Sequence, residues 1–254
     1  MSIITLTSDF GIKNYNVANL KGNLLSISEG LNIVDISHEI DNYDIEEAAY
    51  MLSNSYRSFP VGTINIVLVN IYYSKNPRII LAYNSGYYFI VPDNGILSLI
   101  IEDDENTSLR AFDYNTSIAQ LYEVIDKIID GLMNGIEIDS LGEKVVGINN
   151  KISIKPVVSN NIIRASVIHI DNFGNAIVNI KKEFFYSKNI DGNFKLYYNP
   201  KDYISKISNN YTDVSIGDEL CFFNSAGYME IAVNMGNASE MLGLTKDSAI
   251  QIFF

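Results

Sequence analysis

Residues 3–11 read Ile-Ile-Thr-Leu-Thr-Ser-Asp-Phe-Gly, an apolar run that ends in a polar turn. The apolar part predicts a short buried strand, and the residues that follow predict a loop. Asp9 therefore falls at the carboxyl end of the first predicted strand. Open α/β sheets bind their ligands at this edge, so Asp9 is the first candidate for a functional residue.

The segments after this strand alternate between helical and strand-like patterns. Apolar residues recur at helical spacing over residues 17–29, from Asp44 to Tyr56, and over residues 120–133. The helix after Asp44 has a capping-box-like start, because Glu47 follows Asp44 by three residues. Further β-rich runs lie at residues 32–36, 63–69, 78–83 and 87–91. This alternation predicts an α/β N-terminal domain with a largely parallel mixed sheet.

The pattern changes after Gly135. Residues 136–160 contain no long periodic segment, whereas the chain from Ile162 onward is strand-like, with turns at residues 171–175 and 225–227. A smaller, mainly-β C-terminal domain is therefore expected. The predicted organisation is an N-terminal domain at residues 1–140, a linker at residues 141–160 and a C-terminal domain at residues 161–254.

The composition is that of a folded globular protein. The chain has 254 residues, of which 47% are hydrophobic and 19% are charged, and its formal net charge is −12. An acidic protein is a poor nucleic-acid ligand, and no apolar run has the length of a membrane helix. Cys221 is the single cysteine, so no intramolecular disulfide forms. We expect a cytoplasmic protein with no nucleic-acid or membrane partner.

The titratable side chains offer few metal ligands. The sequence has no cysteine pair and no closely spaced pair of histidines, so no metal site is expected. The two histidines, His38 and His169, lie in or beside apolar strands and are expected to be structural.

Four polar clusters are candidates for function. They are Asp9, the turn at residues 92–95, the turn at residues 171–175, and the paired segments 224–228 and 236–238. Taken singly, each is explained by turn chemistry, which favours Gly, Asn and Asp without any ligand.

Taken together, the clusters form a recognisable series. The motifs are residues 5–11 (TLTSDFG), 21–22 (KG), 35–40 (DISHEI), 92–95 (PDNG), 170–175 (IDNFGN), and 224–225 (NS) through 236–238 (GNA). In this order they resemble the S-adenosylmethionine (SAM) hydroxide adenosyltransferases, the SAM hydrolase family related to fluorinase and chlorinase. The resemblance covers nearly the whole chain. It implies two domains and a homotrimer, with the ligand held between the N-terminal domain of one subunit and the C-terminal domain of the next.

The resemblance also implies a nucleoside pocket, with SAM or adenosine as substrate or ligand and no cofactor. Asp9 and Asp171 match the carboxylates that hold the ribose hydroxyls, a task suited to acceptor-only groups. The remaining matched positions are Phe173 and Asn175 at the adenine, and Ser225 and Ala238 at further ligand contacts.

The positions that activate water in the family are different here. The family segment Asp-Pro-Gly-Val-Gly-Thr-x-Arg aligns with residues 70–77, so its aspartate is replaced by Asn70 and its arginine by Pro77. The family histidine is replaced by Gln120. Arg78, one residue beyond Pro77, is a possible stand-in for the missing arginine. By this comparison the chain is a divergent member that lacks the catalytic Asp-Arg-His set.

These replacements favour an adenosine- or SAM-binding protein with weak or absent hydrolysis of SAM to adenosine and methionine. Asn and Gln accept no proton near neutral pH, and general-base assistance contributes about 10²- to 10⁴-fold in rate. Three alternatives stay open: an active SAM hydrolase that uses Arg78 or backbone groups, a halide-using relative, and a non-catalytic structural homologue with an unrelated ligand. The halide alternative is the weakest, because family halogenases carry Tyr at the Asn70 position and Ser or Gly at the Leu121 position.

Overall fold

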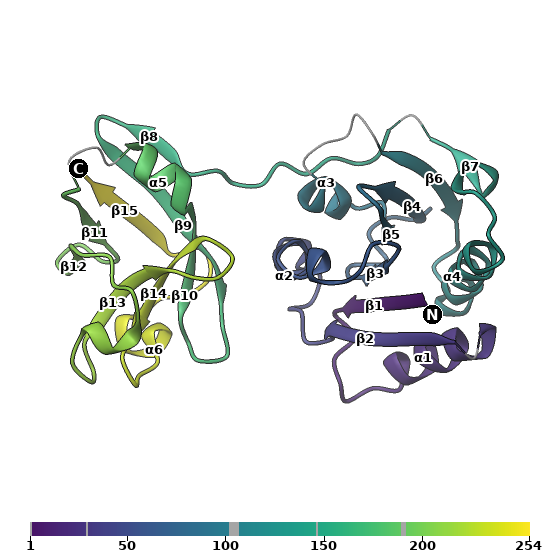
Figure 1. The fold of residues 1–254 in the computed structure, drawn as a ribbon, viewed down its shortest axis with the longest axis horizontal. Coiled ribbons are helices and arrows are strands. Elements are labelled where there is room, and N and C mark those ends of the chain that lie inside the picture. Colours follow the sequence, from purple (N-terminus) through teal and green to yellow (C-terminus); the bar gives the residue numbers. More distant parts are fainter. Residues whose placement is uncertain (1, 29, 102–106, 146, 189–191) are drawn as a thin grey trace. The chain divides into compact units, whose positions relative to one another are not determined.

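The computed structural model describes residues 2–28, 30–101, 107–145, 147–188 and 192–254. It divides into two compact units, residues 1–153 and 154–254 (Figure 1). The first unit is an α/β domain with a mixed sheet, and the second is smaller and mainly β. The predicted fold class is therefore confirmed.

Strands and helices alternate in the first unit. Its strands are β1 (Ser2–Ser8), β2 (Leu31–Ser37), β3 (Ile64–Leu68), β4 (Arg78–Asn84), β5 (Tyr87–Pro92), β6 (Ser108–Asp113) and β7 (Glu143–Lys144). Its helices are α1 (Asn16–Ile27), α2 (Ile45–Ser53), α3 (Ile96–Ile100) and α4 (Ile118–Met133), with 3-10 turns η1 (Tyr56–Ser58) and η2 (Ile138–Ser140). The helix predicted at residues 17–29 ends at Ile27, and residue 29 lies outside the described residues.

The sheet of the first unit has the strand order β2-β1-β3-β5-β4-β6-β7. Strands β2, β1, β3 and β5 run parallel to their neighbours in this series, and the pairs that involve β4, β6 and β7 are antiparallel. The parallel part places the carboxyl ends of β1 and β3 at one edge. Asp9 and Asn70 follow these two strands, so the fold brings both residues to the same edge of the sheet.

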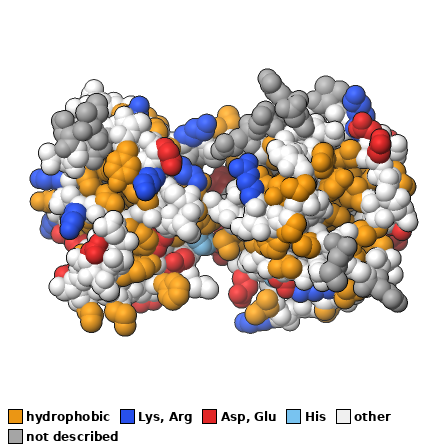
Figure 2. All heavy atoms as spheres, viewed as in Figure 1, with side chains coloured by type: hydrophobic (Ala, Val, Ile, Leu, Met, Phe, Trp, Pro, Cys, Tyr) orange, Lys and Arg blue, Asp and Glu red, His pale blue; other side chains and the backbone are white. Residues whose placement is uncertain are grey.

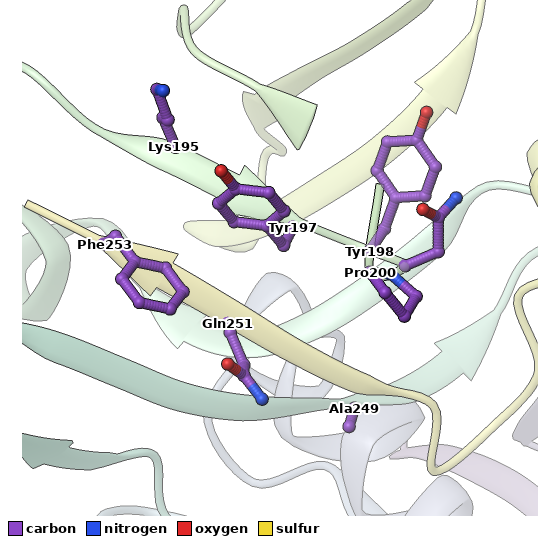
Figure 3. A pocket seen from close by; sticks show the side chains of 8 residues that line it. Lys195, Tyr197, Tyr198, Pro200, Ala249, Gln251 and Phe253 are labelled. Atoms are coloured by element: carbon purple, nitrogen blue, oxygen red, sulfur yellow. The ribbon is translucent and has the colours of Figure 1, made fainter. Parts of the chain in front are cut away.

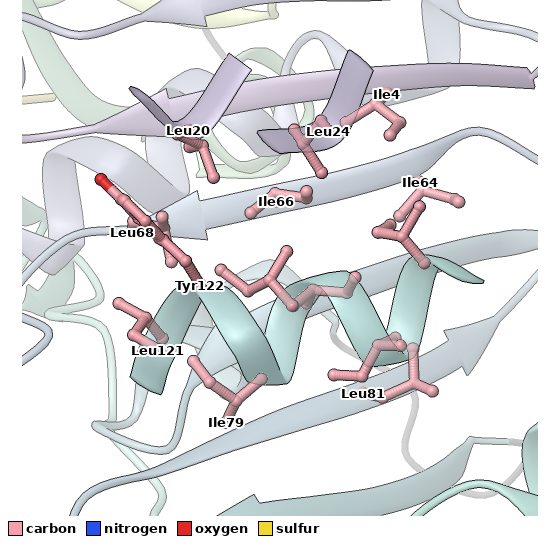
Figure 4. Close-up of a cluster of buried hydrophobic side chains, with 14 of the residues drawn as sticks. Ile4, Leu20, Leu24, Ile64, Ile66, Leu68, Ile79, Leu81, Leu121 and Tyr122 are labelled. Atoms are coloured by element: carbon pink, nitrogen blue, oxygen red, sulfur yellow. The ribbon is translucent and has the colours of Figure 1, made fainter. Parts of the chain in front are cut away.

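Helices cover both faces of this sheet. Leu20 and Leu24 of α1 pack with Leu121 and Ile125 of α4 against one face (Figure 4). Ile45 of α2 and residues of α3 belong to a second buried cluster on the other face (Figure 1). Both faces of β1, β3 and β5 are therefore largely buried, as parallel sheets require, whereas the edge strand β2 is partly exposed.

The start of α2 is fixed by its own sequence. The side chain of Asp44 accepts hydrogen bonds from the backbone N–H groups of Glu46 and Glu47, at 3.1 and 3.0 Å. Glu47 Oε2 accepts the backbone N–H of Asp41, at 2.9 Å. Tyr56, predicted to lie on the same helix, belongs to η1 instead. Its side chain packs in the same buried cluster as the residues of α2.

The second unit is built on antiparallel strands. Its strands are β8 (Val157–Ser159), β9 (Ile162–Ile170), β10 (Ala176–Lys181), β11 (Lys195–Tyr197), β12 (Tyr203–Ile204), β13 (Glu219–Phe223), β14 (Tyr228–Val233) and β15 (Ala249–Phe253). Two short helices, α5 (Lys182–Lys188) and α6 (Ala238–Leu242), and the 3-10 turn η3 (Tyr211–Asp213) complete it. The strand order is β12-β11-β15-β9-β10-β14-β13, with β8 paired to β9.

Residues predicted as the linker take part in both sheets. Within residues 141–160, β7 pairs with β6 in the first unit and β8 pairs with β9 in the second.

No helix in the described part of the chain is both long and apolar enough to cross a bilayer. On the face drawn in Figure 2, the Lys and Arg side chains are scattered and do not merge into one basic surface.

Candidate functional site

Asp9 lies at the carboxyl edge of the first sheet, where two backbone N–H groups donate hydrogen bonds to its side chain. Its Oδ2 accepts hydrogen bonds from the backbone N–H groups of Tyr43 at 3.0 Å and of Asn70 at 3.1 Å. Both donors belong to residues with positive φ, +68° and +53°, which turn the chain sharply at that point. Among the described residues no cation forms an ion pair with Asp9, so its carboxylate keeps acceptor capacity for a ligand.

A polar network braces the loop that carries Asp9. Ser8 Oγ lies 2.7 Å from His38 Nδ1, and the backbone N–H of Gly11 donates to His38 O at 2.7 Å. His38 Nε2 lies 3.1 Å from Asp35 Oδ1, and Lys21 Nζ lies 2.5 Å from Asp35 Oδ2. His38 is buried and ties the loop after β1 to the loop after β2. These contacts stabilise the loop, and a structural role for His38 stays a prediction.

The charge of Asp35 is maintained within this network. Partial burial acts to raise the pKa of Asp35, but the hydrogen bonds and charges of Lys21 and His38 outweigh it. The pKa of Asp35 is therefore held below its usual value, and the carboxylate stays ionised beside Lys21 at neutral pH.

Arg78 is engaged in an ion pair. Its Nε and Nη2 both lie 2.6 Å from Oδ2 of Asp93, whose side chain is 2% exposed. The other carboxylate oxygen of Asp93 accepts the backbone N–H of Asn149 at 2.7 Å. Arg78 thereby neutralises a buried charge at the turn that follows β5.

Replacing Arg78 by methionine is expected to lower the free energy of unfolding by about 3 kcal/mol, because it leaves Asp93 buried without its cation. Urea denaturation measures this change. Lys75→Met, which removes an exposed charge nearby, is the matched control and is expected to change stability by less than about 0.5 kcal/mol. A loss below about 1 kcal/mol in the Arg78 variant would mean that the ion pair does not stabilise the fold.

Tyr73 lies within the segment of residues 70–77, and Tyr114 and Tyr122 belong to the same buried cluster as Ile71 of that segment. Tyr114 donates its hydroxyl to the backbone carbonyl of Ile71, and Tyr122 donates to that of Asn16 at 3.0 Å. Tyr73 Oη accepts the backbone N–H of Arg78 at 3.1 Å. Burial raises the pKa of Tyr73 and of Tyr114, and that of Tyr122 to about 12. These phenols are therefore neutral near pH 7 and are not proton acceptors there.

The side chain of Gln120 makes a local hydrogen bond. Gln120 lies in the first turn of α4, and its Oε1 accepts the backbone N–H of Asn115 at 3.1 Å. Pro77 offers its carbonyl to the backbone N–H of Tyr114 at 3.2 Å. Neither group can take a proton from water near neutral pH.

A second polar cluster lies in the C-terminal unit, in the turn between β9 and β10. Asp171 Oδ1 accepts the backbone N–H groups of Phe173 and Asn175, at 2.9 and 2.8 Å. Asp171 Oδ2 accepts the side-chain Nδ2 of Asn175 at 3.0 Å. The turn thus fixes the Asp171 carboxylate and the Asn175 amide against each other.

This cluster continues into two residues that sequence reasoning missed. Asn175 Nδ2 also donates to Tyr211 Oη at 3.1 Å, and Tyr211 donates to Glu230 Oε1 at 3.3 Å. Asn224 Nδ2 donates to Glu230 Oε2 at 3.1 Å. Glu230 is 6% exposed in the middle of β14, and this single acid in the apolar run of residues 228–233 is the signal that could have revealed it.

The pKa of Glu230 lies above its usual value. Desolvation and the negative charge of Asp171 raise the pKa of Glu230, and the hydrogen bonds from Asn224 and Tyr211 oppose that rise. Burial and the Glu230 carboxylate likewise raise the pKa of Tyr211, which stays protonated and serves as a donor.

The other predicted site residues lie on neighbouring loops of this unit. Phe173 is 78% exposed at the tip of the β9–β10 turn, and Ser225 is exposed in the β13–β14 turn. Ala238 is fully buried at the start of α6. The β9–β10 turn packs closely on α6: Gly174 has a φ of +79°, and a Cβ there would lie 2.0 Å from Asn237 Oδ1.

A separate pocket of about 790 Å³ lies on the outer face of β11 and β15. Tyr197, Phe253 and Gln251 line it (Figure 3). None of the predicted site residues lines this pocket. The carboxylates of Asp41, Asp44 and Glu47 have oxygens within 4.8 Å of one another, and those of Asp44 and Glu47 accept the hydrogen bonds at the start of α2 described above.

Comparison with known proteins agrees with this architecture. The model of the SAM hydroxide adenosyltransferase N-terminal domain matches residues 4–142, and that of the C-terminal domain matches residues 165–251. The chain is 31% identical to the (R)-S-adenosyl-L-methionine hydrolase of Methanocaldococcus jannaschii, over 100% of this chain and 97% of that protein. It is 26% identical to a fluorinase of an Actinoplanes species, with 91% of each protein covered.

A solved structure has the same fold. An uncharacterized conserved protein from Thermotoga maritima superposes with a TM-score of 0.87 at 25% sequence identity, over 99% of this chain and 100% of that one. The two domain models, which together cover most of the chain, and the full-length similarity to the archaeal protein lead to one conclusion. The chain belongs to the SAM hydroxide adenosyltransferase family.

Proposed function

We propose that the protein binds SAM or adenosine and hydrolyses SAM slowly or not at all. The observation that carries the binding part is the Asp9 carboxylate, which is oriented by two backbone N–H groups and paired with no cation among the described residues. Such a group can accept a hydroxyl of a ribose diol. Full-length similarity to a protein named as a SAM hydrolase supports the same ligand class.

The second half of the proposed pocket is the polar cluster of the C-terminal unit. Asp171 and Asn175 are held rigidly by the turn between β9 and β10. The family resemblance assigns the ribose to Asp171 and the adenine to Asn175, Phe173, Ser225 and Ala238. We propose the homotrimer implied by the same resemblance, and a cytoplasmic protein in keeping with the single cysteine.

Slow hydrolysis follows from the chemistry of the reaction. Water displaces methionine at the ribose 5′ carbon, and a sulfonium leaves readily, so the demanding step is to position water and remove its proton. Asn70, Pro77 and Gln120 accept no proton near neutral pH, and the surrounding tyrosines are protonated. Loss of general-base assistance lowers the rate by about 10²- to 10⁴-fold.

An active SAM hydrolase is the second candidate, and the 31% identity to the archaeal hydrolase favours it. In that case Arg78 or backbone groups would replace the missing residues. The ion pair between Arg78 and buried Asp93 counts against Arg78 in this role. Moving the guanidinium into the site would leave the buried Asp93 carboxylate without its cation.

Calorimetric titration tests the binding proposal. Adenosine and SAM are each titrated into the protein, and saturable heat is expected with a dissociation constant well below 1 mM. No heat with either compound at millimolar concentration would contradict nucleoside binding.

A further inference from the structure

One of the four polar clusters in the sequence, the turn at residues 92–95, contacts the segment that follows β3. Asn94 is partly buried in this turn, and its Nδ2 lies 2.9 Å from Val69 O and 3.3 Å from Asn70 O. Its Oδ1 accepts the backbone N–H of Ile96 at 3.2 Å. An oxygen must face this N–H, so the nitrogen must face the two carbonyls. The orientation of the Asn94 amide is therefore fixed.

The peptide group between Val69 and Asn70 is held at both ends. Its carbonyl oxygen accepts Asn94 Nδ2 at 2.9 Å, and its N–H donates to Asp9 Oδ2 at 3.1 Å. A trans peptide group is planar, so its C=O and its N–H point in opposite directions and turn together. The hydrogen bond from Asn94 on one side therefore fixes the direction of the N–H on the other side, toward Asp9.

The backbone at this point needs such support. Asn70 has a φ of +53°, in the left-handed region that residues other than glycine adopt only rarely. Val69 is fully buried, so its carbonyl would lose its partner away from water if Asn94 released it. A rotation of the peptide group toward a new partner would also turn the N–H away from Asp9.

Asp9 Oδ2 has one further donor, the backbone N–H of Tyr43 at 3.0 Å. The two donors come from different loops, since Tyr43 lies in the chain after β2 and Asn70 in the chain after β3. With the Tyr43 contact alone, the carboxylate can turn about a single hydrogen bond. Both donors are therefore required to hold its other oxygen in one direction.

We propose that Asn94 is a positioning residue, which directs the Asn70 N–H at Asp9 and so holds the Asp9 carboxylate in the orientation that accepts a ribose hydroxyl. This inference rests on the proposed nucleoside binding and adds a residue that the family resemblance does not assign to the ligand. The neighbouring Asp93 has a different task, because its carboxylate pairs with Arg78.

Asn94→Asp separates the two roles of this side chain. The variant keeps an oxygen for the Ile96 N–H but presents a second oxygen, in place of the nitrogen, to the Val69 carbonyl. Two acceptor oxygens repel each other, so the peptide group is expected to turn and Asp9 to lose the Asn70 N–H. Calorimetric titration with adenosine, an uncharged ligand, is expected to show about tenfold weaker binding.

Asn94→Ser is a second variant, without the added charge. Its hydroxyl can accept the Ile96 N–H, as serine does in turns, but it has no amide nitrogen for the two carbonyls. It is expected to weaken adenosine binding by at least about threefold. Asn54→Asp is the matched control, because Asn54 Nδ2 donates to Tyr50 O at 2.7 Å at the end of α2. This control makes the same chemical change outside the site and should keep the dissociation constant within about twofold.

A double-mutant cycle distinguishes positioning from a general loosening of the fold. In the Asp9→Asn protein the ionised acceptor is already absent, so its orientation no longer matters. Adding Asn94→Asp to this protein is expected to weaken adenosine binding by less than about twofold further. A merely structural role would give the same loss whether or not the Asp9 carboxylate is present.

Circular dichroism establishes that each variant is folded before titration, and the cycle is run with Asn94→Ser if Asn94→Asp does not fold. The inference is overturned if a folded Asn94 variant binds adenosine as tightly as the unmodified protein, or if the loss is equal with and without the Asp9 carboxylate. Failure of the unmodified protein to bind adenosine is a different result, because it removes the proposed function itself.

Discussion

Asp9→Asn is expected to weaken adenosine binding by roughly 10- to 150-fold, the equivalent of about 1.5 to 3 kcal/mol for hydrogen bonds to a charged group. The amide oxygen of the variant can still accept the backbone N–H groups of Tyr43 and Asn70. These two hydrogen bonds and the fold are therefore expected to be preserved. What is lost is the ionised acceptor offered to the ribose hydroxyls. Calorimetric titration with adenosine measures the change.

Asp113→Asn is the matched control, because Asp113 is an exposed aspartate at the end of β6 in the same sheet. It should leave the dissociation constant unchanged within about twofold. Equal affinities of the Asp9 variant and the unmodified protein would show that Asp9 is a turn residue only, held by two backbone donors, and would remove the main support for a nucleoside pocket.

Restoring proton acceptors is expected to give the second large effect. The double variant Asn70→Asp, Gln120→His places a carboxylate and an imidazole at the two positions where the family resemblance expects them. Asn70 has a φ of +53°, a conformation that Asp also tolerates, so the backbone need not change. We expect SAM hydrolysis to increase by about 10²-fold or more, since general-base catalysis contributes 10²- to 10⁴-fold.

Chromatography of adenosine released from SAM over time measures this gain. Asn32→Asp, which adds a carboxylate at an exposed position of β2, controls for the change in charge and should have the rate of the unmodified protein. If the double variant and the unmodified protein hydrolyse SAM at the same rate, then the lack of a base at Asn70 and Gln120 does not limit the reaction. That result would favour an active enzyme that uses other groups.

The fold was predictable where the sequence pattern is long or has a clear start. Helix α2 is periodic and is capped by Asp44, and α4 carries apolar residues over four turns, so both were predicted close to their true bounds. Helix α3 was missed because its five residues are too short to show a helical period. Helices α5 and α6 were missed for a similar reason, since each lies between strands and is less than two full turns long.

The candidate site was predictable only at its turns. Asp9 and the residues 171–175 stand out because strand ends and tight turns have sequence signals. Glu230 and Tyr211 join this cluster through contacts between residues 19 to 36 positions apart, which no local pattern encodes. The pairing of Arg78 with Asp93 was missed in the same way, because β4 and β5 bring the two side chains together only after the hairpin forms.

We propose that this protein binds SAM and hydrolyses it slowly or not at all. Equilibrium dialysis tests both parts in one sample: protein in excess is dialysed against SAM for several hours, and the bound fraction is then analysed for SAM, adenosine and methionine. We predict that SAM accumulates on the protein side and is recovered intact. Equal SAM on both sides of the membrane, or adenosine and methionine formed at about one turnover per minute or faster, would contradict it.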